Sequence, residues 1–158
     1  MAVMAAIVFI LTYTFKIAFA DAYTPLGDCA VLIGVMVLGR QKGALSGAVG
    51  AALSDLISGY PHWIIPTFII KFLMATAMGL VVEKYMPKAK FNFAVGAVVG
   101  GILQIIGYTA CKIGFYGFAQ AMVMTPTLII QTIAGIVITV VFVTALRTSG
   151  ILERVKAM

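Results

Sequence analysis

Long apolar segments, interrupted only by short clusters of charge, constrain the fold of this chain more than any other feature. Only 10% of the residues are charged and 63% are hydrophobic, whereas a soluble domain carries about 25% charged residues. A soluble fold of this length could not bury so much apolar surface, and a lipid bilayer is the solvent that suits it. The sequence predicts an all-α integral membrane protein, and its length suits one domain, residues 1–158.

Charges and turn residues divide the chain into six apolar segments. The predicted helices are 2–19, 27–39, 43–58, 64–82, 92–111 and 124–146. A full membrane span needs roughly 20 apolar residues, and the first, fourth, fifth and sixth segments come near this length. The second and third are shorter, so we expect them to tilt or to pack inside the bundle. The segments together predict a compact bundle of six transmembrane helices.

Small residues recur along the third segment, which reads "GALSGAVGAALS" from Gly43. Glycine and alanine spaced four residues apart let helix backbones approach closely in lipid. Gly96 and Gly100 repeat this spacing in the fifth segment. The pattern indicates either ordinary helix packing within the bundle or a surface for a partner protein.

The basic residues predict how the bundle is oriented. With six spans, eight of them fall on one side: Arg40, Lys42, Lys84, Lys88, Lys90, Arg147, Arg154 and Lys156. The positive-inside rule places that side and both termini in the cytoplasm. The net charge of +6 is then a topology signal, with anionic lipid headgroups rather than nucleic acid as its neighbours. Asp21, Asp28 and Asp55 fall on or near the outer side, with His62 and Trp63.

Motifs for enzymatic chemistry are missing from the sequence. The stretch "GRQKGALSG" has glycines and a lysine, but not in the order of a P-loop. No cluster has zinc-ligand spacing, and no Gly-x-Ser-x-Gly elbow is present. We therefore expect no catalytic residues, no metal and no cofactor on this chain.

Ionisable residues inside the spans carry the functional signal. Lys71 lies about 10 Å from the outer end of the fourth helix at the helical rise per residue. A charge at that depth usually faces the bundle interior or a wet cavity. Asp55 lies near the outer end of the third helix. Three interpretations stay open: a structural Asp55–Lys71 ion pair, a lysine that extends outward to the interface, or contact of either group with a polar ligand.

Aromatic and amide side chains add further candidates in the outer half. His62 and Trp63 belong either to an interfacial aromatic belt or to a platform on which a flat ligand stacks. Gln104, Tyr108 and Lys112 are four residues apart, so they share one helix face. With Gln131 at a similar depth, they form either the wall of a pocket or polar contacts between helices.

Two outer loops are candidate lids over such a pocket. The first is "FADAYTPLGD", in which Pro25 and Gly27 make a turn, and it is equally compatible with a plain connector. The second is "KIGFYGFAQAMVMTP", which contains Tyr116 and Gln120. Both loops are expected between helices at the outer face.

Several of these segments resemble a known family, the substrate-binding S-components of energy-coupling factor (ECF) vitamin transporters. The stretch "LGDCAVLIGVMVLGRQKGALSGAVGAALSDLISG" is similar to the family's second and third helices, and "PTFIIKFLMATAMGLVVEK" to its fourth. Ala2 and Ala6 match the Ala-x-x-x-Ala motif by which the family docks on its coupling subunit. Within the family, the pattern is most similar to members assigned to hydroxymethylpyrimidine or pyridoxine.

The resemblance implies a mechanism and a set of partners. The chain would capture a vitamin or precursor in an outward-facing pocket of a bacterial plasma membrane. It would dock on a transmembrane coupling subunit, and two ATPase subunits on other chains would hydrolyse ATP. Residues that fall in matching places are Lys71, Gln104, Tyr108, Lys112 and Gln131, and His62, Trp63 and Tyr116 fall in matching loops. Asp55 is a further candidate for binding, because its carboxylate could accept a hydrogen bond from a ring amine or a protonated ring nitrogen.

Other functions remain as alternatives. A self-contained carrier or channel often shows inverted repeats or broken helices near the midplane, and no convincing repeat is found in the sequence. An S-component for thiamine or riboflavin is a second alternative. An intramembrane enzyme would need an acid/base pair, for which Asp55 with His62 is the only candidate.

Overall fold

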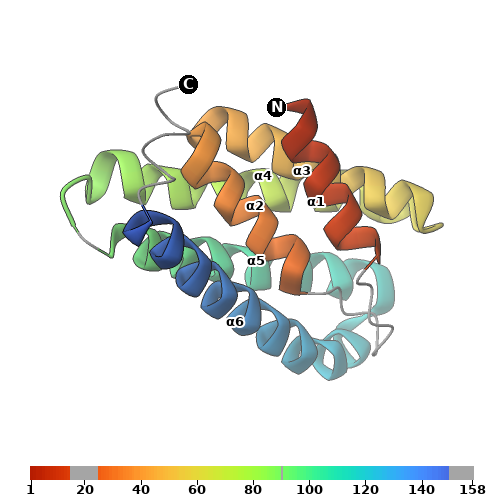
Figure 1. Cartoon of the computed structure of the whole chain (residues 1–158). Helices are drawn as coiled ribbons and strands as arrows, with labels where there is room; N and C mark the ends of the chain where they lie inside the picture. The colour runs from red at the N-terminus through yellow and green to blue at the C-terminus, as the bar shows by residue number, and fades with distance from the viewer. Residues whose placement is uncertain (15–24, 90, 150–158) are drawn as a thin grey trace.

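The computed structural model describes residues 1–14, 25–89 and 91–149. Six α-helices make up most of this part of the chain (Figure 1): α1 (Ala2–Thr14), α2 (Pro25–Leu38), α3 (Arg40–Ile57), α4 (Ile64–Leu80), α5 (Asn92–Tyr116) and α6 (Phe118–Thr148). A 3-10 turn, η1 (Pro61–Trp63), leads into α4, and a π-helical turn, η2 (Val81–Tyr85), extends it. The described residues form no strand, which confirms the all-α prediction.

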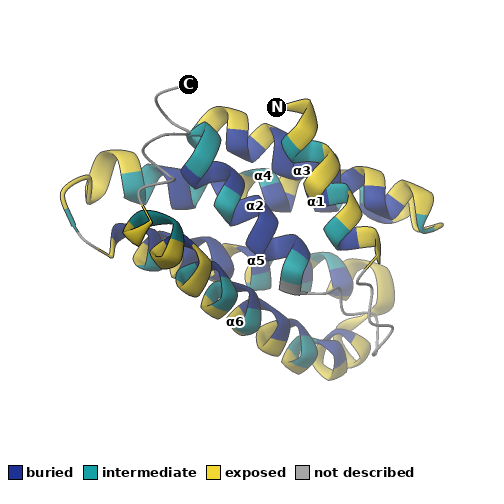
Figure 2. Ribbon diagram, viewed as in Figure 1, coloured by how far each residue is buried: buried dark blue, intermediate teal, exposed yellow. Residues whose placement is uncertain are grey.

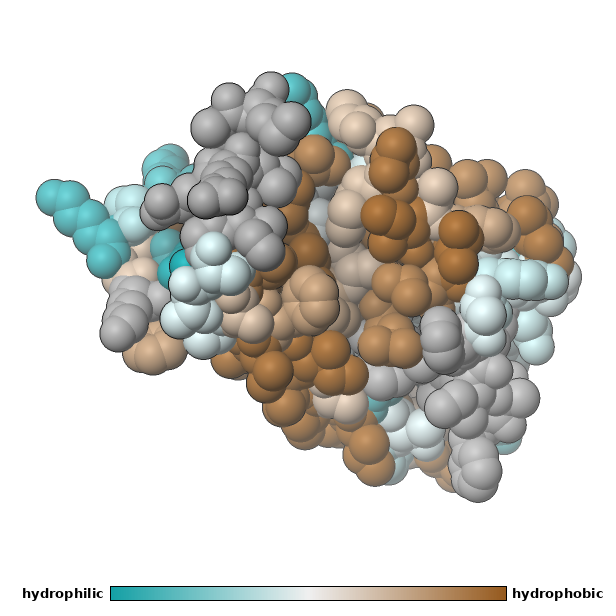
Figure 3. Space-filling model, viewed as in Figure 1, coloured by the Kyte–Doolittle hydropathy of each residue, from teal (hydrophilic) through white to brown (hydrophobic). Residues whose placement is uncertain are grey.

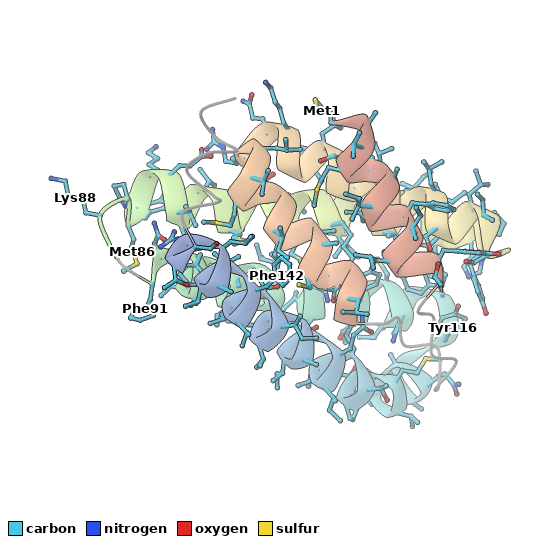
Figure 4. The ribbon with its side chains drawn as sticks, in the orientation of Figure 1. Met1, Met86, Lys88, Phe91, Tyr116 and Phe142 are labelled. Carbon is cyan, nitrogen blue, oxygen red and sulfur yellow. The ribbon has the colours of Figure 1, made fainter. Side chains whose placement is uncertain are left out.

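Three continuous helices among the described residues are long and apolar enough to cross a membrane. They are Pro61–Tyr85, Asn92–Tyr116 and Phe118–Thr148. Ala2–Thr14 and Leu26–Leu38 are shorter apolar helices. The middle of the face in Figure 3 is mostly hydrophobic, and hydrophilic residues gather at the left end, where Figure 4 labels Lys88. This distribution fits a multi-pass membrane protein.

Helix α2 occupies the middle of the bundle, as its short length predicted. It packs against α1, α3, α4 and α6, and almost all of its surface is buried (Figure 2). The outward face of α6 is exposed instead, as a lipid-facing helix requires. A helix of 14 residues is therefore tolerated at the centre because its neighbours cover it.

The small residues of α3 serve packing inside the chain. A Cβ atom added at Gly47 would lie 2.7 Å from a methyl carbon of Val31 on α2, and one at Gly43 would meet the α2 backbone. Ala44, Ala48 and Ala51 are buried as well. The partner-surface interpretation of this stripe is therefore wrong, because other helices of the same chain already cover it.

The connection between the last two helices differs from the prediction. Helix α5 continues to Tyr116 and α6 begins at Phe118, so a single residue separates them. Gly117 has φ of 86°, a left-handed conformation that glycine adopts without steric cost. The predicted lid over 112–126 is therefore helical rather than a loop. Even Pro126 lies inside α6.

Residues 15–19 of the predicted first helix and residues 19–24 of the first outer loop lie outside the described residues. The end of that loop is helical, because α2 already begins at Pro25.

Described basic residues at the start of α3, after α4 and at the end of α6 lie at one end of the bundle, which we call the basic end. Lys90, Arg154 and Lys156 lie outside the described residues. The backbone N–H of Arg40 donates to Glu83 Oε1 at 2.8 Å, and the Arg40 side chain lies 3.8 Å from the same carboxylate. Arg147 donates to Asn92 Oδ1 at 2.9 Å. Figure 4 labels Lys88 at this end and Tyr116 at the opposite one, which we call the aromatic end. The placement of the basic end in the cytoplasm stays a prediction.

Two apolar cores fill the interior. The larger lies toward the basic end and includes Val8, Leu32, Met74, Phe93 and Val143 from five helices. The smaller lies toward the aromatic end and consists of Trp63, Ile70, Tyr108 and Leu128. Along α4, α5 and α6, four buried polar residues lie between these two cores, namely Lys71, Gln104, Gln131 and Thr132, and they form part of the candidate site.

Candidate functional site

A buried ion pair joins α2 to α4 between the two cores. Lys71 Nζ contacts Asp28 Oδ1, and both side chains are more than nine-tenths buried. Lys71 also donates to Gln104 Oε1 at 2.7 Å. Asp28 lies in the first turn of α2, where the helix dipole favours a negative charge. The prediction that Lys71 faces the bundle interior is confirmed.

Amide groups from α5 and α6 complete this network. Gln104 Nε2 donates to Asp28 Oδ2 at 2.7 Å and to Thr132 Oγ1 at 3.1 Å. Gln131 Nε2 donates to Asp28 Oδ2 at 3.3 Å. We call Asp28, Lys71, Gln104, Gln131 and Thr132 the polar layer. Its members come from four helices, and such a layer fixes how those helices are arranged.

Of the three interpretations left open for Lys71, the structural ion pair with Asp55 is wrong, because Lys71 pairs with Asp28 instead. Asp28 was placed near the outer side, at the start of the second predicted helix, and was not among the candidate residues. Two sequence signals pointed to it: it precedes the apolar run of α2 directly, and Asp is favoured in a first helical turn. The partner of a buried lysine across helices depends on packing, which spacing along one chain does not give.

Aromatic side chains gather next to the polar layer at the aromatic end. Trp63 Nε1 donates to the Tyr116 hydroxyl at 3.0 Å, and His62 Nε2 lies 3.2 Å from the same oxygen. The Trp63 ring is 5.2 Å from that of Phe115 and 5.7 Å from that of Tyr108. We call His62, Trp63, Tyr108, Phe115 and Tyr116 the aromatic cluster. Trp63 is buried in this cluster, with 7% of its surface exposed.

Tyr108 connects the aromatic cluster to the polar layer. Its hydroxyl donates to Thr67 Oγ1 at 3.2 Å, and its ring centroid lies 5.5 Å from Lys71 Nζ, within the range of a cation–π contact. Gln104, Tyr108 and Lys112 are all buried, as expected for residues that share one face of α5. The structure thus brings together His62, Trp63, Lys71, Gln104, Tyr108, Tyr116 and Gln131.

Asp55 lies apart from the polar layer, in the last turn of α3. It is 1% exposed, and its carboxylate oxygens have no hydrogen-bond partner among the described residues. The residues that follow it, Gly59 to His62, are exposed and lead into η1. Tyr60 N–H donates to the Asp55 carbonyl at 3.0 Å, which holds this turn against the helix end.

The chemistry available at this end combines stacking and hydrogen bonding. Rings of the aromatic cluster offer flat apolar faces, and the polar layer offers amide, ammonium, hydroxyl and carboxylate groups. Ligand sites commonly consist of apolar walls with a few convergent polar groups. Among the described residues, no group of three metal-ligating side chains is found. The arrangement suits an uncharged or weakly charged heterocycle.

The two alanines predicted to dock on a partner are accessible. Ala2 and Ala6 are both exposed on α1. Neighbouring apolar residues on this helix, Val3, Ile7 and Ile10, are exposed as well. Helix α1 therefore presents an apolar face outward, while Val8 on its other face is buried against α3.

Comparison with known proteins identifies the family. A family model described as ECF-type riboflavin transporter, S component, matches residues 1–148. A relative from Pyrococcus woesei, described as "Uncharacterized protein in gap 3'region", is 30% identical over 122 residues, which cover 75% of this chain and 78% of the relative. No solved structure matches the chain. The chain therefore belongs to the ECF-type riboflavin transporter S-component family, so it is a vitamin-capture subunit of a membrane transporter rather than an enzyme.

Proposed function

We propose that this chain binds an unphosphorylated heterocyclic vitamin or precursor at the aromatic end, with that end facing outward from the cell membrane. The observation that carries the proposal is the juxtaposition of the polar layer and the aromatic cluster through Tyr108. An ion pair inside a membrane bundle is costly to build and marks functional sites more often than it adds stability. Here the Lys71 ammonium of the pair lies 5.5 Å from the centroid of the Tyr108 ring, which belongs to the aromatic cluster on which a flat ligand can stack.

The ligand chemistry follows from the charges near the site. The three arginines of the chain, Arg40, Arg147 and Arg154, belong to the predicted cytoplasmic segments and not to the aromatic end. Arginine is the residue best suited to bidentate phosphate recognition. A ring with hydroxyl and amino groups suits the amides of Gln104 and Gln131 better. Hydroxymethylpyrimidine carries both an amino group and a hydroxymethyl group, and pyridoxine carries three hydroxyl groups and a ring nitrogen.

Riboflavin is the second candidate, favoured by the description of the matching family model. Its ring system is larger and also flat, and its ribityl hydroxyls would suit the amides of the polar layer. The two candidates differ in a simple observable, because a flavin absorbs visible light. A chain that retains riboflavin through purification would be yellow.

Transport would need partners on other chains. We propose that α1, with Ala2 and Ala6 exposed, docks on a transmembrane coupling subunit, and that two ATP-binding subunits supply the energy. With no P-loop in its sequence, this chain would leave ATP hydrolysis to them. Both termini would lie in the cytoplasm, as the basic residues predict.

Binding to the purified chain in detergent tests the proposal. Trp63 is the only tryptophan and lies in the aromatic cluster, so its fluorescence reports on a ligand that stacks there. Titration with hydroxymethylpyrimidine, pyridoxine, thiamine and riboflavin should give saturable quenching by one compound, and calorimetry should confirm it. If neither method detects binding of any of the four, the proposed function is wrong.

A further inference from the structure

The two buried acids near the aromatic end differ in their surroundings. The Asp28 carboxylate accepts hydrogen bonds from Lys71, Gln104 and Gln131. Asp55 is buried as deeply, yet neither of its carboxylate oxygens has a partner among the described residues. An ionised carboxylate only accepts hydrogen bonds, and burying it without donors is unfavourable. Donors that arrive with a ligand would remove this penalty.

Two hydroxyl groups beside Asp55 also lack a hydrogen-bond partner. Ser54 Oγ and Ser58 Oγ are also buried and unpartnered among the described residues. Ser54 and Ser58 are four residues apart on α3, and Asp55 is three residues before Ser58, so the three side chains lie on neighbouring positions of one helix face. Four unpartnered oxygen atoms are thus concentrated in the last turn of α3 and the residue that caps it.

This turn is next to the aromatic cluster. The Tyr60 N–H donates a hydrogen bond to the Asp55 carbonyl at 3.0 Å, and the Trp63 N–H donates one to the Tyr60 carbonyl at 3.0 Å. The exposed turn that follows Asp55 leads within a few residues to His62 and Trp63. A flat ring that stacks on the aromatic cluster would therefore have an edge within reach of α3. The opposite edge would face the amides of the polar layer.

We propose that Asp55 anchors the ligand by accepting hydrogen bonds from two adjacent N–H groups. An aminopyrimidine presents such a pair when the ring nitrogen next to its exocyclic amino group is protonated. Two carboxylate oxygens without donors match two parallel N–H donors in a fork, and charge-assisted bonds of this kind are the strong ones. The imide edge of a flavin has one N–H between two carbonyl acceptors, so it does not match. Ser54 or Ser58 would pair with a hydroxymethyl group on the same ring. The inference rests on the proposed function and selects hydroxymethylpyrimidine among its candidate ligands.

The test compares two ligands and two variants by calorimetry. The ligands are hydroxymethylpyrimidine and the analogue in which oxygen replaces its amino group. The variants are Asp55→Asn, which keeps the size of the side chain, and Glu83→Gln, which removes an acid at the basic end as a matched control. Asp55→Asn should weaken binding of the amino compound about 10- to 100-fold, the range for one lost hydrogen bond to a charged group. Glu83→Gln should leave the affinity unchanged.

The outcomes separate this inference from the function on which it rests. Wild-type chain that binds the oxo analogue as tightly as the amino compound would overturn the role of Asp55, whether or not the Asn variant folds. Unchanged affinity in a folded Asp55→Asn variant would do the same. In either case, saturable binding of a vitamin would still support the capture function. Binding of riboflavin alone would leave the capture function intact and refute the aminopyrimidine anchor.

Discussion

Lys71 is the residue on which the polar layer depends. Its ammonium contacts Asp28 and Gln104, and the Tyr108 ring lies close to it. In a low-dielectric interior, a charge that loses its partner is far more costly than a pair that is removed as a whole. The network should therefore respond differently to single and paired substitutions.

Substitution of Lys71 tests this dependence. Lys71→Met should lower the free energy of unfolding by about 3–5 kcal/mol, because Asp28 is then buried without its cation. The double variant Asp28→Asn/Lys71→Met should recover much of this loss. Denaturant unfolding in detergent measures both, with Lys84→Met at the exposed basic end as a control. Additive losses in the double variant would show that the two residues do not act as a pair.

Tyr116 has a smaller but specific role, since its hydroxyl accepts from the buried Trp63 N–H. Tyr116→Phe should cost about 1 kcal/mol in unfolding free energy, because the indole N–H loses its acceptor. It should also shift the emission of Trp63, whose surroundings change. Tyr85→Phe is the control, since Tyr85 is 72% exposed. Identical emission spectra of Tyr116→Phe and wild type would contradict the contact.

The sequence singled out most residues of the polar layer and the aromatic cluster, but not their pairing. Lys71, Gln104, Tyr108 and Gln131 were found because polar residues inside apolar helices are rare and costly. Asp28 was missed because it stands at a helix start, where an acid has an ordinary structural explanation. The error over Asp55 has the same origin, since helix packing decides which of two acids reaches a lysine.

Helix positions were predicted well where apolar runs are long and poorly where a turn consists of one residue. The fourth helix and the short second and third helices lie close to their predicted limits. The connection after α5 was predicted as the outer loop "KIGFYGFAQAMVMTP", with Tyr116 and Gln120 in it. In the structure Gly117 alone makes the turn, and α6 begins at once. Tyr116 is therefore fixed at a helix end, close to Trp63.

Glycine at the α2–α3 contact is predicted to be essential for packing. A Cβ atom at Gly43 would lie 2.6 Å from the Gly34 carbonyl oxygen, and backbone atoms cannot move aside easily. Gly43→Ala should lower the unfolding free energy by about 1–3 kcal/mol, as overpacking does. Gly114→Ala is the matched control, because nothing lies near its Cβ position, and it should be neutral or stabilising by up to about 1 kcal/mol. Equal melting temperatures for the two variants would contradict the close approach of α2 and α3.

At the scale of the whole molecule, binding and docking are assigned to different surfaces. The residues of the polar layer and the aromatic cluster come from α2, η1, α4, α5 and α6, whereas α1 carries an exposed apolar face with Ala2 and Ala6. The small residues of α3 are buried and cannot contribute to docking. A variant of α1 should therefore affect assembly without affecting capture.

Enlarging the two alanines tests this separation. Ala2→Leu/Ala6→Leu should retain vitamin binding, because neither residue lies near the site, and should reduce co-purification with the coupling subunit of the same organism. Ala110→Leu, an exposed alanine on α5, is the control and should leave assembly unchanged. Normal assembly of the double variant would remove α1 as the docking surface.

The position of a bound vitamin tests the central claim most directly. An experimental structure of the chain with the compound that saturates it should show the ring against Trp63 and Tyr108, with polar atoms within hydrogen-bond distance of the polar layer or Asp55. Density for the ligand elsewhere, for example in the apolar groove between α5 and α6 lined by Ile102, Ile129 and Ile133, would contradict the assignment of the site to the aromatic end.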